Sequence, residues 1–106
     1  MDAAERRRLS ERAQVIKALG HPTRLLFVEQ LAAGERCVCE LTDMADADVS
    51  TVSRHLAVLK HAGILSSERR GQKVFYRLRT PCVLGFFDCI EALVNASDED
   101  VVTCQR

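Results

Sequence analysis

The segment from Asp48 to Leu78, DVSTVSRHLAVLKHAGILSSERRGQKVFYRL, decides the fold. In its first half, apolar residues recur at spacings of three and four, which predicts a helix capped by Asp48 and ended by Gly63. Beyond Gly63 the apolar period falls to two, so we expect two strands, Ile64–Arg70 and Lys73–Leu78. A polar-faced helix followed directly by a basic hairpin is the arrangement of a winged helix-turn-helix.

Helical patterns lie on both sides of this segment. Upstream we expect helices over Ala4–Leu19, from Pro22 to Gly34 and over Glu40–Ala45, and downstream a helix from Cys82 to about Ala96. The last helix is apolar over much of its circumference, so it requires a partner on more than one side. We therefore predict a homodimer in which the first and last helices pack across a two-fold axis.

The expected fold is mainly α with a small β-hairpin, in the order α-α-α-α-β-β-α. Residues 1–96 are expected to form a winged helix-turn-helix DNA-binding and dimerisation domain, and residues 97–106 a polar C-terminal tail. The length of 106 residues, with 47% hydrophobic and 28% charged residues, fits one folded domain.

Several function classes are not expected from this sequence. No stretch approaches about 18 uninterrupted apolar residues, so we expect no transmembrane helix. The N-terminal residues lack the apolar core of a secretory signal, which predicts a cytoplasmic protein. The sequence carries no phosphate loop and no nucleophile-elbow motif, and we predict that it is not an enzyme.

The charge of the chain is unevenly distributed. Its formal net charge is zero, from 15 basic and 15 acidic residues. Residues 50–80, however, carry seven basic side chains and only one acidic side chain, Glu68, a net charge of +6 that the remainder balances with −6. A basic segment of this size attracts polyanions such as double-stranded DNA, although it is also compatible with a solvated face that has no partner.

The predicted DNA contacts come from the fourth helix and from the hairpin that follows it. The polar face of the helix, which can reach base edges and phosphates, consists of Ser50, Thr51, Ser53, Arg54 and His55. The basic hairpin is expected to touch the adjacent backbone or minor groove through Arg69, Arg70, Gln72, Lys73 and Arg77.

Three motifs occur in the order LGHPTRL (residues 19–25), VSRHLAVLKHAGIL (residues 52–65) and RGQKVFYRL (residues 70–78). Together they resemble the ArsR/SmtB family of bacterial repressors, over about residues 13 to 94. The resemblance implies a homodimeric winged-helix repressor that sits on operator DNA and leaves it when an inducer binds. It also implies that the helix over Asp48–Ala62 reads the DNA and that Ile64–Leu78 is the wing.

The chain contains five cysteines, an odd number that argues against a simple disulfide framework. In a cytoplasmic protein we expect reduced thiols. Cys37-Val38-Cys39 resembles the sensor segment of the family's arsenite-responsive and cadmium/lead-responsive members. The resemblance implies As(III) or Sb(III) as inducer and a role in arsenic resistance, with Cd(II) or Pb(II) as the alternative and no permanent cofactor. The simpler alternative is that both cysteines are small hydrophobic residues of the core.

The spacing of this pair has a physical consequence. Residues two apart on an ideal helix do not face each other, so both sulfurs are expected to bind one ion only if the first turn opens or bends. Because the pair is adjacent to the helix-turn-helix, we predict that this distortion moves the reading helix and lowers operator affinity. A helix N-terminus and the neighbouring Arg36 favour the thiolate forms.

Several cysteines are candidates for a third metal ligand. The family's enteric arsenic sensors carry a third cysteine three residues after the pair, where this chain has Thr42. The remaining candidates are Cys82, Cys89 and Cys104. Cys82 and Cys89 are ~10 Å apart along a helix, too far to chelate one ion within a chain. Alternatively, Cys82 starts a helix, Cys89 lies in the dimer interface and Cys104 is a bystander.

Other functions are less well supported. Residues 1–36 contain no cysteine, which weakens the cadmium/lead alternative, and residues 81–106 contain no histidine for a zinc site. A thiol redox or sulfur sensor on the same scaffold is a further alternative, although Leu25–Ala33 lacks the cysteine that such family members carry. A small thiol-based metal-buffering protein is a candidate from a different class.

Overall fold

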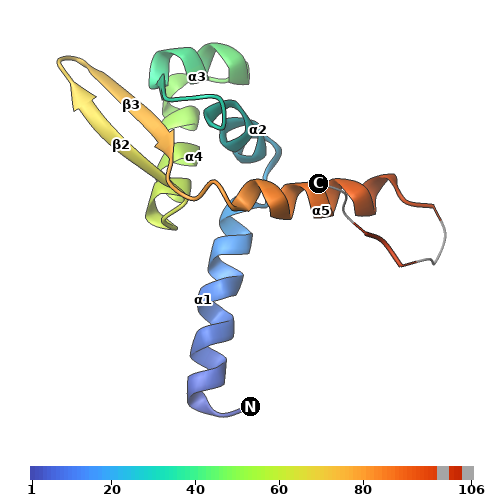
Figure 1. Ribbon diagram of the computed structural model, residues 1–106. Coiled ribbons are helices and arrows are strands. Elements are labelled where there is room, and N and C mark those ends of the chain that lie inside the picture. Colours follow the sequence, from blue (N-terminus) through green and yellow to red (C-terminus); the bar gives the residue numbers. More distant parts are fainter. Residues whose placement is uncertain (98–100, 104–106) are drawn as a thin grey trace.

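The computed structural model describes residues 1–97 and 101–103, and within these ranges the chain forms five helices and a three-stranded antiparallel sheet (Figure 1). The elements in chain order are α1 (Ala3–Leu19), α2 (Pro22–Leu31), β1 (Arg36–Cys37), α3 (Val38–Ala45), α4 (Val49–His61), β2 (Leu65–Arg70), β3 (Lys73–Leu78) and α5 (Val83–Asn95). Helices α3 and α4 form the helix-turn-helix, and β2 and β3 form the wing. The predicted winged helix-turn-helix is confirmed.

The ends of α4, the helix that is expected to read the DNA (the reading helix), follow from local chemistry. The Asp48 carboxylate accepts a hydrogen bond from the backbone N–H of Thr51 at 2.7 Å, which caps the first turn of α4. At the other end Gly63 has a φ of 86°, a left-handed conformation that glycine adopts without strain. Gly71, with a φ of 63°, makes the tight turn between the strands of the wing in the same way.

One element was not expected from the sequence. Strand β1 lies beside β3, so the sheet order is β1-β3-β2 and the predicted order α-α-α-α-β-β-α lacks a strand between its second and third helices. In register, Arg36 is opposite Tyr76 and Cys37 is opposite Phe75. A strand of two residues is too short to show an alternating pattern, and only its partner strand defines it. This strand places the first cysteine of the Cys37-Val38-Cys39 segment in the sheet of the wing.

The core lies between α2, α3, α4 and the inner side of the sheet. Its fully buried side chains include Phe27 of α2, Leu41 of α3 and Leu56 of α4. Tyr76 and Leu78 of β3 pack against this cluster. The core therefore fixes α4 against the scaffold while the opposite face of that helix stays exposed.

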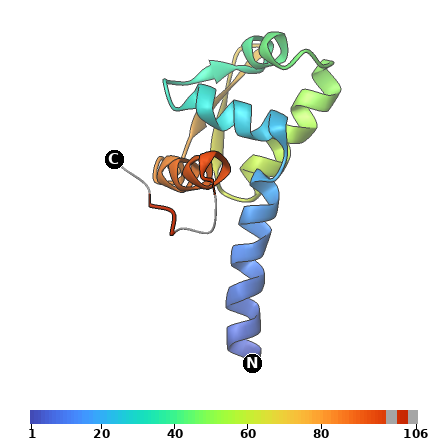
Figure 2. The same cartoon turned by 90° about the vertical axis from the view of Figure 1, so that its right-hand side faces the viewer.

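Helices α1 and α5 differ from the rest, because α1 projects away from the body in both views and α5 extends to one side of it in Figure 1, so that it points toward the viewer in Figure 2. No residue of α5 is buried, and Leu93 is 58% exposed. Ile16 of α1 is 55% exposed. A groove of about 410 Å³ runs between α1, α2 and α5 and is lined by apolar side chains that include Leu25, Phe86 and Ile90. In a single chain these two helices lack the partners that their apolar surface requires.

Within the part of the chain that the structure describes, no helix is both long enough and apolar enough to span a bilayer.

Candidate nucleic-acid interface and thiol site

Helix α4 presents its polar side chains outward. Val52, Leu56 and Leu59 are fully buried against the core, which turns the opposite side of the helix to the surface. On that side Ser50, Ser53 and Arg54 are exposed and Thr51 is half-buried. Short hydroxyls and a guanidinium on one helix face can donate hydrogen bonds to base edges and phosphates in a major groove. The structure thus brings four of the five predicted helix contacts to one exposed surface.

His55 is oriented differently from the other predicted helix contacts. Its ring is half-buried and packs against the ring of His21 with a centroid distance of 4.3 Å. Its Nδ1 lies 3.4 Å from Nη1 of Arg24. Burial lowers the pKa of His55, and the nearby charges of His21, Arg24 and Arg54 lower it further. His55 therefore joins α4 to the start of α2, where the His21 Nδ1 in turn accepts the backbone N–H of Thr23.

The wing carries the second group of predicted DNA contacts. All five predicted wing contacts are exposed: Arg69, Arg70, Gln72, Lys73 and Arg77. Arg69 donates from Nε to the backbone oxygen of Gly71 at 3.3 Å, across the turn. Lys60 of α4 donates from Nζ to Oγ of Ser67 at 2.7 Å, so the base of the wing is tied to the reading helix.

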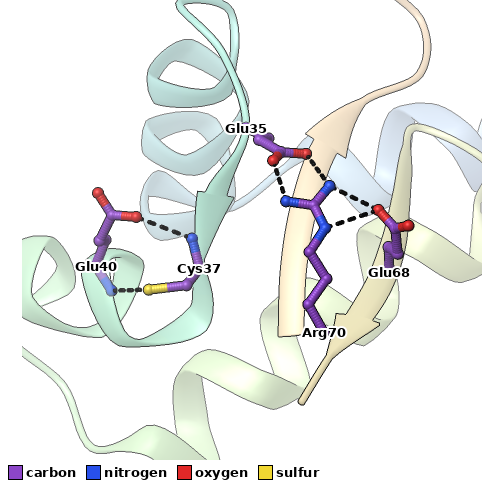
Figure 3. Close-up of polar contacts among 5 residues, drawn as sticks. All are labelled: Glu35, Cys37, Glu40, Glu68 and Arg70. Carbon is purple, nitrogen blue, oxygen red and sulfur yellow. Dashed lines mark hydrogen bonds and ion pairs between the residues drawn. The ribbon is translucent and has the colours of Figure 1, made fainter. Parts of the chain in front are cut away.

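Arg70 is engaged within the protein. Its guanidinium forms ion pairs with Glu35 and Glu68 (Figure 3). It also lies over the ring of Phe75, 4.6 Å from the centroid. The hydrogen bond from Arg70 lowers the pKa of Glu35, with a smaller contribution from the charge of Arg77. The sequence pattern gave no sign of Glu35 as a partner, because the contact spans 35 residues.

Cys37 and Cys39 are joined by a disulfide, with their Cα atoms 5.3 Å apart. The expectation of reduced thiols at this pair therefore differs from the structure. The two sulfurs meet because Cys37 is the N-cap of α3, with extended backbone at φ −78° and ψ 160°, and only Cys39 lies inside the helix. The expected opening of the first turn is consequently not required. The rule that residues two apart diverge holds only when both are helical.

Cys37 also takes part in a capping box. Its Sγ accepts the backbone N–H of Glu40 at 3.3 Å, while the Glu40 carboxylate accepts the backbone N–H of Cys37 at 3.1 Å (Figure 3). Arg36 pairs with the same carboxylate at 3.5 Å. This arrangement starts α3 at Val38, two residues before the predicted Glu40. The Cys-x-x-Glu spacing resembles the Ser/Thr-x-x-Glu capping box and was a usable signal for that start.

The two sulfurs differ in exposure. Cys37 is 3% exposed and contacts the helix N-terminus, whereas Cys39 is exposed. A sulfur that accepts a backbone N–H at a helix N-terminus is stabilised as a thiolate when the pair is reduced. Two adjacent thiolates of this kind form a chelating pair for a soft, thiophilic ion.

Two of the three candidate third ligands, Cys82 and Cys89, lie away from the pair within one chain. Cys82 is the N-cap residue of α5 and Cys89 lies within that helix; both are free and exposed. Helix α5 lies apart from α3 in both views (Figures 1 and 2). Across residues 1–97 and 101–103, no group of three or more His, Cys, Asp or Glu side chains is placed to hold a metal ion. Cys104 lies outside the described residues.

The exposed polar face of α4 beside a basic wing defines a winged helix-turn-helix protein of the DNA-binding class. Residues 21–67 match the family described as bacterial regulatory protein, arsR family. The chain is 35% identical to the biofilm growth-associated repressor of Agrobacterium fabrum, over 92% of this chain and 84% of that protein. It belongs to the ArsR family, whose members are DNA-binding transcriptional regulators and not enzymes.

Other relatives have different regulatory roles. The arsenic resistance transcriptional regulator ArsR1 of Pseudomonas putida is 42% identical, over 80% of this chain and 67% of that protein. The transcriptional repressor SmtB of Mycobacterium tuberculosis is 41% identical to this chain, over 66% of this chain. The match spans about half the length of SmtB. The homodimeric winged helix-turn-helix domain of Mycobacterium bovis superposes with a TM-score of 0.76 at 27% identity, covering 90% of this chain and 88% of that one.

Proposed function

We propose that this protein is a transcriptional repressor that binds operator DNA as a homodimer and is released when arsenite or antimonite binds the thiolates of Cys37 and Cys39. The observation that carries the proposal is the meeting of the two sulfurs at the start of α3, directly before the reading helix. Once reduced, the pair offers two thiolates to a single ion without any unwinding of α3.

The chemistry of the pair favours trivalent arsenic or antimony. Thiolates bind soft, thiophilic species, and two or three thiolates are enough for As(III). Cd(II) and Pb(II) are the alternative inducers, which need further donors that residues 1–36 do not supply as cysteines. Cys104, or Cys82 and Cys89 of a second copy, are the candidates for a third thiolate. The similarity to the arsenic resistance regulator of Pseudomonas putida supports the same inducer.

The apolar surfaces of α1 and α5 support the homodimer. Ile16 on α1 and Ile90 on α5 line the same groove, and both side chains are more than two-fifths exposed in the single chain. Burial of such a surface against a second copy removes apolar area from water and places two reading helices on one DNA. The related domain of Mycobacterium bovis is homodimeric.

The experiment is a fluorescence-anisotropy titration of the reduced protein on DNA from upstream of its own coding sequence. The bound complex is challenged with arsenite, antimonite, Cd(II), Pb(II) and Zn(II) in turn. We expect arsenite and antimonite to release the DNA at near-stoichiometric concentrations, and Zn(II) to leave it bound. A complex that survives excess arsenite, or that only Cd(II) or Pb(II) dissociates, contradicts the assigned inducer.

A second candidate function is a thiol redox sensor, which the Cys37–Cys39 disulfide specifically favours. A small thiolate from solution can attack the exposed sulfur of Cys39, forming a mixed disulfide and releasing Cys37 as a thiolate. The N–H of Glu40 stabilises that leaving group. A second small thiol then displaces Cys39, leaving the protein dithiol and a small-molecule disulfide. Equal operator affinities of the oxidised and reduced proteins, in the absence of arsenite, would exclude this function.

A further inference from the structure

Arg70 stands at the end of β2, where the wing is expected to meet DNA, yet four of the five N–H donors of its exposed guanidinium are bonded to carboxylates of the same chain. Nη2 donates to Oε2 of Glu35 at 3.0 Å, and Nη1 pairs with the other oxygen of the same carboxylate. Nε and Nη2 donate to Oε1 of Glu68 at 3.0 Å and 2.6 Å. One face of the guanidinium covers the ring of Phe75. Two carboxylates therefore surround one cation, and little of its charge is left for a phosphate.

The partners of Arg70 connect directly to the thiol pair. Glu35 immediately precedes β1 and is two residues from Cys37. In the sheet, Cys37 is opposite Phe75, and Phe75 is opposite Glu68, so these three residues form one row across all three strands. Arg70 contacts two members of this row and also Glu35 at the entry to β1. Strand β1 is thereby joined to the wing both through the row and through the ion pair.

We propose that Arg70 is a positioning residue that holds the wing to β1 and is not a ligand of DNA phosphate. The group formed by Glu35, Glu68 and Arg70 is called the wing latch. Its role in placing the wing is independent of the inducer. Its role in release rests on the proposed function: arsenite binds the thiol pair, and the latch carries the effect of that binding to the wing. Arg69 is the contrast: its one hydrogen bond is to a backbone oxygen, and its charge is available to DNA.

The first test measures operator affinity as a function of salt for Arg70→Gln and, as the matched comparison, Arg69→Gln. Each phosphate contact that is lost lowers the slope of log K against log salt by about one. We expect Arg69→Gln to lower the slope by about one per subunit and Arg70→Gln to leave it at the wild-type value. A slope lowered equally by Arg70→Gln would overturn the proposal.

A second variant separates the latch from a general loss of wing structure. Glu35→Gln keeps the Arg70 cation but removes the carboxylate that ties it to the entry of β1, leaving Glu68 as its partner. If Arg70 were a phosphate ligand, this change would free it and raise both affinity and slope beyond the effect of Asp43→Asn, an exposed carboxylate on α3 that serves as the charge control. If the three residues act as a latch, Glu35→Gln and Asp43→Asn have the same salt slope of operator binding. The double variant with Glu35→Gln and Arg70→Gln then has the same operator affinity as Glu35→Gln alone.

The inducer-dependent part is tested by release. We expect Glu35→Gln and Arg70→Gln to bind arsenite as the wild type does, measured by loss of two titratable thiols, while the arsenite-induced drop in operator affinity shrinks by about fivefold or more. An undiminished drop in both variants contradicts the coupling. If the wild type itself is not released by arsenite, the proposed inducer fails, and the salt slopes still decide the role of Arg70.

Discussion

The Sγ of Cys37 accepts a hydrogen bond from the backbone N–H of Glu40 at 3.3 Å, so the candidate ligand sulfur is also the N-cap of α3. This dual role explains how two cysteines separated by one residue can act together: one stands just outside the helix and the other just inside it. It also couples the chemistry of the sulfur to the stability of the first helix of the helix-turn-helix. The cap persists while the same sulfur is bonded to Cys39.

Replacing the cap atom separates its structural role from its chemical one. Cys37→Ala removes the acceptor and is expected to lower the free energy of unfolding by about 1 kcal/mol, the usual cost of losing an N-cap. Cys37→Ser keeps an acceptor at the same position, and we expect it to retain most of that stability while losing arsenite binding. Urea unfolding followed by circular dichroism measures both. Equal destabilisation by the two substitutions would show that the cap is unimportant.

The packing of His55 predicts a pH dependence of stability. Because burial lowers the pKa of His55 in the folded protein, the unfolded chain binds the proton more readily. The contribution of neutral His55 to stability is therefore fully present above pH 6.5, the ordinary pKa of histidine. It is lost as the pH falls through the lower pKa of the folded protein. We expect the free energy of unfolding to rise with pH across this acidic window, and His55→Gln to reduce that rise. His61→Gln, an exposed histidine at the end of the same helix, is the control and should leave the rise intact.

The exposed apolar surface of α5 predicts an effect on assembly. Ile90→Lys places a charge in the groove shared with α1, and we expect a monomer that remains folded but binds operator DNA at least tenfold more weakly. Met44→Lys, on an exposed apolar side chain of α3, is the matched control. Light scattering coupled to size exclusion gives the mass. A dimeric Ile90→Lys protein would place the interface elsewhere.

The exposed Arg54 predicts a direct role in DNA recognition. Loss of a bidentate contact to a base costs about 1–3 kcal/mol, so we expect Arg54→Gln to weaken operator binding by about tenfold or more without changing stability. Arg54→Lys keeps the charge but loses the planar fork, and we expect an intermediate loss. Anisotropy on the operator and on an unrelated duplex separates specific from general binding. Wild-type affinity for Arg54→Gln would remove it from the interface.

The elements that the sequence predicted are those governed by local rules. The Asp48 cap, the apolar stripe of α4 and the turn at Gly71 are each set by neighbours within a few residues, and all three are present. The strand β1 was not predictable because it exists only through its pairing with β3. The partners of Arg70 were not predictable for the same reason, since Glu35 is distant along the chain.

The thiol site was predictable in composition but not in geometry. The Cys37-Val38-Cys39 pattern identified the pair, whereas the start of α3 was placed two residues late because cysteine is not among the usual N-cap residues. The expectation that the helix must open has a different origin: it treats both cysteines as helical positions, whereas Cys37 stands outside the helix as its N-cap. The orientation of His55 was hidden too, because both sides of α4 carry polar groups and only the packing against His21 and Arg24 shows which way the ring turns.

The most direct measurement of the central claim compares arsenite-induced operator release by the reduced wild type and by a variant carrying both Cys37→Ser and Cys39→Ser. We expect equal operator affinity of the two proteins without arsenite, because neither sulfur belongs to the predicted DNA-contacting surface. On addition of arsenite, the wild type should dissociate and the variant should stay bound. Release of the variant at the same arsenite concentration would contradict the account.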